Sequence, residues 1–373
     1  MSEALHIQAT ALRDWLCGSA LPFWVRTAID YRGGWYEDLA LDGTPNADKI
    51  RRMRVQARQI YVYALADKMG WYPGKEIIRA TFDFMTEYGL EVGDKPGFLH
   101  LLTADCGPED ESRDFYDHAF YLLGCGWAYH VTGDPKMLDT GHKVADFIDT
   151  LASPEGGWRE GIPENTPRRQ NPHMHFLEAS MTWHDITGDP RWMAYADQVY
   201  ALFETHFFDP ENHVIREFFE DDWSLAKGDL GDTAEPGHAA EWIWLLWLYE
   251  QRSGQDTYAY ADKLYQRLLS FGDGFQNDEE TPDGTPRRAT KRLWVQTELI
   301  KAHLAQAARG VGGAADEAAK TIEDFMKVYL REDGTWIDQI DEDGAPIAKT
   351  IPVSTFYHIA CMIFEAGDVT GLV

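Results

Sequence analysis

A four-residue turn, Thr-Gly-Asp-Pro, occurs twice and does most to limit what this chain can fold into. The copies occupy residues 132–135 and 187–190, and each precedes a stretch whose apolar residues recur at helical spacing. Gly permits the left-handed residue that ends one helix, Asp caps the next helix, and Pro fits its first turn. Ser253-Gly254 precedes a third such stretch. At a repeat of two helices plus loops, the chain has room for about six helical hairpins.

The other connections share a second signal. Gly-Gly-Trp occurs at 33–35 and 156–158, and Gly-Thr-Trp at 334–336, each in a polar stretch rich in turn residues. We expect short β-hairpins or long loops here, on one face of the molecule. Trp-rich helices that are apolar on more than one side, without polar capping repeats, favour a closed double ring over an open solenoid. The predicted fold is an all-α (α/α)6 barrel, a single domain over residues 1–373 without a linker.

Charge and hydropathy exclude several classes of partner. The chain has 62 acidic and 34 basic residues, a net charge of -28, and the acidic surplus is spread along its length. This charge disfavours nucleic acid and anionic membranes as partners. The sequence shows neither a spanning apolar run nor a signal-peptide layout, so we expect a soluble cytoplasmic protein. The four cysteines are far apart and form no CxxC, which indicates reduced core thiols.

Two histidines lie close together in the stretch RRQNPHMHFLEA at 168–179. Asn171 is a good N-cap and Pro172 fits a first helical position, so a helix is expected to begin there. His173 and His175 then point to nearly opposite sides, whereas His175 and Glu178 share a face. The helix therefore argues against a chelating histidine pair and leaves His175 and Glu178 as the unit of interest.

The same unit recurs further along the chain. His238 and Glu241 follow Pro236 with the same spacing, 63 residues after His175, and His358 lies in another apolar helix. Each histidine alone could be a satisfied core residue. Three of them at comparable helix positions also fit an acid/base site at one mouth of the ring.

Arg54 and Arg58 lie on one face of an otherwise apolar helix. An arginine that faces a core needs an acidic partner or an anionic ligand. We interpret Arg58 as a structural ion pair and Arg54 as the functional candidate. Histidine beside carboxylate suits proton transfer, and arginine suits an enediolate oxygen. Without a phosphate-cradling glycine loop, an HExxH or a GxSxG motif, a neutral sugar is favoured over phosphate, zinc or serine chemistry.

Six motifs make the chain resemble the N-acylglucosamine 2-epimerase superfamily, which includes cellobiose 2-epimerases and mannose isomerases. They are RMRVQARQIYVYA at 53–65, YDHAFYLL at 116–123, NPHMHFLEA at 171–179, EPGHAAEWIWLL at 235–246, RLWVQTE at 292–298 and FYHIA at 356–360. The resemblance implies an (α/α)6 barrel. It also implies proton transfer at C2 of an aldose without a metal or other cofactor.

Roles carried over from the resemblance cover both catalysis and binding. The implied catalytic residues are His358, His238, Glu241 and Arg54, with the two histidines flanking C2 and the arginine near the substrate oxygens. The implied sugar-binding residues are Asn171, His175, Glu178, Tyr116 and Trp294. For Tyr116 and Trp294, packing in an aromatic core is the alternative to sugar binding.

The motifs NPHMH and RLWVQTE most resemble the branch that interconverts mannose and fructose. In that reading His358 moves the carbon proton, Glu241 moves the oxygen proton, and His238 supports ring opening. The segment VQTELI has no adjacent Trp pair, which favours a monosaccharide. The alternatives are an aldose 2-epimerase of N-acylglucosamine or cellobiose type, an (α/α)6 glycoside hydrolase, and a non-catalytic sugar-binding module.

Overall fold

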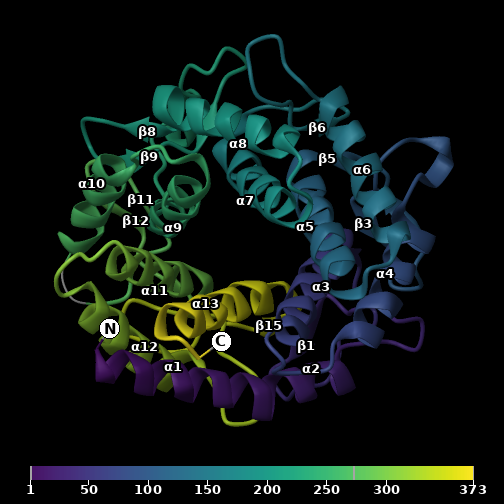
Figure 1. The fold of residues 1–373 in the computed structure, drawn as a ribbon, viewed down its shortest axis with the longest axis horizontal. Coiled ribbons are helices and arrows are strands. Elements are labelled where there is room, and N and C mark those ends of the chain that lie inside the picture. Colours follow the sequence, from purple (N-terminus) through teal and green to yellow (C-terminus); the bar gives the residue numbers. More distant parts are fainter. Residues whose placement is uncertain (1, 272–273, 373) are drawn as a thin grey trace.

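The computed structural model describes residues 2–271 and 274–372 and contains two concentric rings of helices (Figure 1). The inner ring is formed by α3 (Met53–Lys68), α5 (Phe115–Thr132), α7 (Gln170–Thr187), α9 (Pro236–Ser253), α11 (Leu293–Ala308) and α13 (Phe356–Thr370). The outer ring is formed by α1 (Glu3–Trp15), α2 (Leu21–Thr27), α4 (Lys75–Gly89), α6 (Pro135–Thr150), α8 (Pro190–Leu202), α10 (Tyr258–Leu269) and α12 (Ala314–Tyr329). Each inner helix packs on the next, and α13 closes the ring on α3. The predicted (α/α)6 barrel is confirmed.

Burial separates the two rings as their sequences indicate. In α4 the buried residues Ile78, Phe82 and Met85 recur every three or four positions, so one stripe faces the core. In α3 every residue from Val55 to Ala66 is buried, because outer helices cover one side and the barrel interior covers the other. No helix among the described residues is long and apolar enough to cross a membrane.

The short turns lie where inner helices end and outer helices begin. Gly133 ends α5 and Gly188 ends α7. Each of these glycines has a φ of 69°, in the left-handed region. Asp134 then caps α6 by accepting from the amide of Lys136, and Asp189 caps α8 in the same way. The roles predicted for the Thr-Gly-Asp-Pro turns are confirmed.

The long connections lie at the opposite end and carry short antiparallel strands. Five of these strands directly precede an inner helix or its first turn and pair with a strand from another connection, which fixes where the helix begins. The pairs are β1 (Asp38–Ala40) with β15 (Thr350–Pro352), β2 (Arg51–Arg52) with β3 (Leu101–Leu102), β5 (Arg113–Asp114) with β6 (Gly161–Ile162), β7 (Arg168–Arg169) with β10 (Phe218–Phe219), and β13 (Lys291–Arg292) with β14 (Gln339–Ile340). The remaining strands are β4 (Pro108–Asp110) on β3, β8 (Phe208–Asp209) with β9 (Val214–Ile215), and β11 (Glu279–Glu280) with β12 (Pro286–Arg288).

The tryptophans of the repeated Gly-x-Trp signal anchor these connections. Trp35, Trp158 and Trp336 are buried, and each forms a bridge with a residue six positions earlier, as expected for short hairpins. Trp336 also stacks on Trp24, with ring centroids 4.4 Å apart, and joins the two ends of the chain. All four cysteines are free; three are buried, while Cys17 is only half-buried.

Candidate active site

A cavity of about 340 Å³ opens at the end of the barrel where the inner helices begin. Its lining residues come from the first turns of the inner helices and from the connections just before them. They are Arg52, Arg58, Tyr116, Asn171, His175, Glu235, His238, Glu241, Arg292, Trp294, Asp338, Pro352, Ser354, Thr355 and His358. The structure therefore brings together seven of the nine predicted site residues and leaves out Arg54 and Glu178.

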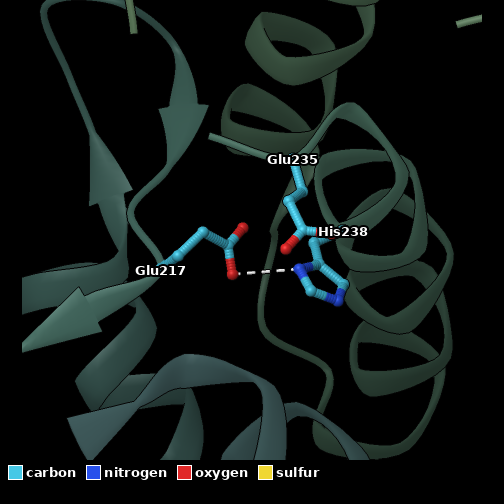
Figure 2. A group of neighbouring side chains, drawn as sticks. All are labelled: Glu217, Glu235 and His238. Atoms are coloured by element: carbon cyan, nitrogen blue, oxygen red, sulfur yellow. Dashed lines mark hydrogen bonds and ion pairs between the residues drawn. The ribbon is translucent and has the colours of Figure 1, made fainter. Parts of the chain in front are cut away.

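His238 lies in the first turn of α9, beside two carboxylates, those of Glu217 and Glu235 (Figure 2). Its Nδ1 is 2.9 Å from Oε2 of Glu217, which reaches it from the connection between β9 and β10. Burial alone would lower the pKa of His238, but Glu217 and Glu235 outweigh burial and raise that pKa to about 9. The imidazole is therefore charged at neutral pH and can donate a proton.

His358 occupies the third position of α13 and also has a carboxylate at Nδ1, with Oε1 of Glu298 at 2.8 Å. Here burial and the charges of Arg58 and Lys301 act together and lower the pKa of His358 well below its usual range. The imidazole is neutral at neutral pH. Because Nδ1 faces Glu298, Nε2 is the nitrogen left to accept a proton.

Glu241 lies one turn after His238 but does not contact it as the HxxE spacing suggested. Both of its carboxylate oxygens are buried and have no hydrogen-bond partner among the described residues. Its nearest charge is the fully buried ammonium of Lys301, 3.9 Å away, which also lies 2.6 Å from Glu298. A buried carboxylate without a donor is ready to accept from a ligand hydroxyl in the cavity.

His175 lines the cavity and pairs with Glu178, as predicted from their spacing. His175 Nδ1 lies 3.3 Å from Oε2 of Glu178, and the Tyr357 hydroxyl donates to that carboxylate. Glu178 therefore sits behind His175 and does not line the cavity. Burial lowers the pKa of His175 to about 3, so its imidazole is neutral.

Asn171 departs from its predicted role as a helix cap. Helix α7 begins one residue earlier, at Gln170, because the preceding strand β7 pairs with β10 up to Arg169. Asn171 is thus inside the first turn, where its Nδ2 lies 3.0 Å from Nε2 of His238. An amide in this position can donate to the neutral imidazole or, turned over, accept from the charged one.

His173 points away from the cavity, as its position opposite His175 predicted. Its Nε2 accepts from the backbone amide of Trp158, and its Nδ1 faces the carbonyl of Arg169. The ring packs edge to face on Phe115 and Trp223. His173 is a buried structural residue.

The two arginines of α3 differ in their contacts from what the sequence suggested. Arg54 pairs with Asp117, Nη1 to Oδ1 at 2.7 Å, and does not line the cavity. Arg58 lines the cavity and forms no ion pair within residues 2–271 and 274–372; it donates to the Tyr116 hydroxyl and to the Ser354 carbonyl. The interpretation of Arg58 as a structural ion pair is wrong, because Asp117 pairs with Arg54.

Tyr116 and Trp294 form walls of the cavity. The ring of Trp294 contacts both imidazoles, with its centroid 5.3 Å from that of His238 and 5.6 Å from that of His358. Tyr116 packs edge to face on His175 at 5.3 Å. Both aromatic side chains therefore shape the ligand space in addition to packing.

A model for the N-acylglucosamine 2-epimerase family (GlcNAc 2-epimerase) matches residues 34–362. The chain belongs to this family. It is 34% identical to "Mannose-6-phosphate isomerase" of Rhizobium meliloti (strain 1021), with 99% of each chain covered, and 26% identical to "D-mannose isomerase" of Marinomonas mediterranea, with 76% of each covered. Its fold superposes on cellobiose 2-epimerase from Bacillus thermoamylovorans B4167 with a TM-score of 0.85 at 21% identity, covering 96% of this chain and 98% of that one. The protein is a sugar isomerase or epimerase of the GlcNAc 2-epimerase family.

Several residues at or next to the cavity were not predicted from the sequence. Glu298 and Lys301 follow Trp294 at intervals of four and seven, so helical spacing places all three on one side of α11. Glu217 carries no such signal, because it lies in a connection 21 residues before His238. Arg292 lines the cavity and borders Glu235 and Asp278.

Two groups of side chains have ligand atoms within 4.8 Å of one another, close enough to hold a metal ion. They are Glu217, Glu235 and His238 (Figure 2), and Glu241, Glu298 and His358. In the second group the ammonium of Lys301 already neutralises Glu298, so a further cation would lie against a positive charge. Metal independence stays a prediction, for chelation to test.

Proposed function

We propose that the protein interconverts D-mannose and D-fructose through a cis-enediol, without a metal. One observation carries the proposal: two imidazoles, on α9 and α13, line one cavity together with Trp294, and each is held at Nδ1 by a carboxylate. Opposite pKa shifts make His358 a base and His238 an acid at the same pH.

The proton steps follow from these states. His238 donates a proton to the ring oxygen while Glu241 takes the proton of the anomeric hydroxyl, and the sugar opens to the aldehyde. Nε2 of His358 then takes the C2 proton and Glu241 returns its proton to O1, which gives the C1=C2 enediol. Glu241 takes the O2 proton and His358 returns the carbon proton to C1, which gives the ketose. Ring closure of the ketose returns a hydroxyl proton to His238 and the Glu241 proton to O2. The reaction conserves every atom and needs no oxidant.

The oxygens need a proton carrier and a positive charge. Glu241 has two unpartnered oxygens beside the cavity and is assigned to carry the proton from O2 to O1. Arg58 is assigned to stabilise the negative charge that develops on these oxygens, because its guanidinium has no carboxylate partner among the described residues and its Nε is buried and unpaired. A fixed cation in a buried site stabilises such charge strongly.

The charges around the cavity favour an unphosphorylated sugar. Three arginines line it, but Arg52 pairs with Glu37 and Arg292 pairs with Glu235 and Asp278. Only Arg58 remains without an acidic partner among the described lining residues. A phosphate dianion is usually bound by several unpaired donors and cations. We therefore favour mannose over the mannose 6-phosphate named in the Rhizobium meliloti relative.

A product screen tests this proposal. The protein is incubated with mannose, mannose 6-phosphate, glucose, N-acetylglucosamine and cellobiose, and products are followed by NMR. We expect fructose from mannose at a kcat/KM well above that for any other sugar. Conversion of another sugar without fructose formation from mannose would refute the proposal.

The second candidate is an aldose 2-epimerase, and the placement of His238 supports it. His238 lines the same cavity as His358 but comes from a different inner helix, so it is the candidate to deliver a proton to the opposite face of C2. Mannose in heavy water separates the two reactions. Isomerisation gives fructose labelled at C1, whereas epimerisation gives glucose labelled at C2.

A further inference from the structure

A second cavity lies at the other end of the barrel axis and is larger than the first. Its volume is about 470 Å³, against about 340 Å³ for the active-site cavity. Residues from the C-terminal halves of all six inner helices of Figure 1 contribute to its lining. The reaction described above uses none of this space.

The two cavities have no lining residue in common in the described chain, and a layer of buried side chains lies between them. Lys301 is fully buried in this layer, with its ammonium 3.5 Å from the ring centre of Trp244. The Tyr61 hydroxyl donates to Cys361 Sγ, and Tyr357 donates to Glu178. A ligand in the second cavity is therefore out of reach of His238 and His358.

Aromatic rings from four inner helices surround the second cavity. They are contributed by Tyr61 of α3, Trp127 of α5, Trp244 and Trp247 of α9, and Phe364 of α13. Tyr61, Trp244 and Phe364 are buried at its floor, whereas the two other tryptophans are half-buried toward its opening. Apolar walls with a few polar groups are typical of small-molecule pockets.

The polar groups of the second cavity favour a ligand that both donates and accepts hydrogen bonds. Nε1 of Trp127 is a buried donor without a partner among the described residues, so it needs an acceptor. Half-buried Glu365 and exposed Asp368 supply carboxylate oxygens that can accept from a ligand donor. An ammonium group only donates. A phosphate or carboxylate only accepts, and it would also meet the four lining carboxylates, which include Glu178 and Asp185, and the negative ends of six helices. A hydroxyl group does both.

The cationic side chains at the opening of the second cavity already have contacts within the protein. Arg252 donates through Nε and Nη2 to Asp185, and Lys68 lies 5.1 Å over the ring of Trp127. They leave no unpaired cationic cluster for an anion among the described lining residues. We propose that this second cavity binds a neutral saccharide, stacked on its indole rings and hydrogen-bonded through its hydroxyls to Trp127 and Glu365.

Indole N–H signals in NMR test this proposal on the intact protein. The probes are methyl α-D-mannoside and sucrose, which have no free carbonyl and so are not turned over. We expect the Trp127 signal to shift along a saturable curve with at least one probe. The shift should be lost in Trp247→Ala and weakened in Asp368→Asn. It should persist in Trp15→Ala, which removes a tryptophan outside both cavities, and in Trp294→Ala, which alters only the active-site wall.

Two results would overturn the proposal. One is a Trp127 signal that neither probe moves up to its solubility limit. The other is a shift that disappears in Trp294→Ala, because it would then report binding at the active site. The product screen is independent of this experiment, so failure of either proposal is distinguishable from failure of the other.

Discussion

The two histidines to which we assign the proton transfer have the same immediate contact and opposite pKa shifts. Nδ1 of His238 lies 2.9 Å from a carboxylate, and Nδ1 of His358 lies 2.8 Å from another. Yet the pKa of His238 is raised to about 9, while that of His358 is lowered well below its usual range. A carboxylate at Nδ1 therefore does not by itself decide whether an imidazole acts as acid or base.

Other charged side chains near each imidazole account for the opposite pKa shifts of His238 and His358. Glu235 adds a second carboxylate beside His238, whereas Arg58 and Lys301 place positive charge near His358. In a buried site these charges are weakly screened, so they shift a pKa strongly. These opposite pKa shifts predict one charged and one neutral imidazole in the same site at neutral pH.

The largest expected effect comes from removing the base. In His358→Ala we expect turnover of mannose to fall by about 10²–10⁴-fold and C2 hydrogen exchange in heavy water to stop. His6→Ala, an exposed histidine on α1, serves as the control and should match the wild type. Exchange that continues in His358→Ala at the wild-type rate would contradict its role as base.

The two arginines of α3 give the next largest contrast. Arg58→Leu should lower kcat by about 10²–10³-fold, because the charge facing the enediolate is lost. Arg54→Leu leaves buried Asp117 with His100 as its remaining ion-pair partner, so it should chiefly lower the free energy of unfolding, by up to about 3–5 kcal/mol. Kinetics at 25 °C and urea unfolding measure the two effects. A larger loss of kcat in the folded Arg54 variant would reverse the assignment.

This pair of arginines also marks the limit of the sequence reading. Local turn chemistry was enough to predict the hairpins, because Gly133 and Asp134 act through residues next to them. The roles of Arg54 and Arg58, in contrast, depend on a residue that is distant in the sequence. They lie one turn apart on the same helix face, and only the position of Asp117 on α5 decides which of them is neutralised. Glu217 was missed for the same reason: a loop brings it to His238.

A smaller effect tests the acid. The pKa of His238 is raised above its unfolded value, so the imidazolium is present below about pH 9 and lost as pH rises through that value. Glu217→Gln removes the carboxylate at Nδ1 and should move the alkaline limb of kcat/KM down by about 1–3 pH units. Glu211→Gln, an exposed position in the same connection, is the control. An alkaline limb that stays in place in Glu217→Gln would separate activity from this ion pair.

The smallest expected effect is that of chelation. Treatment with EDTA should leave kcat/KM for mannose unchanged, because the imidazoles and Arg58 supply the proton transfer and the charge. Activity that is lost to EDTA and restored by zinc would place a metal at one of the two Glu and His groups and replace the proposed mechanism.

The most direct test of the contrast is a ¹⁵N NMR titration of the imidazole nitrogens, with His238→Gln and His358→Gln used for assignment. The account predicts that at pH 7.5 His238 has both nitrogens protonated and titrates near pH 9. It predicts that His358 is neutral at the same pH, with its proton on Nδ1. Two histidines that titrate together near their usual value of about 6.5 would contradict the account.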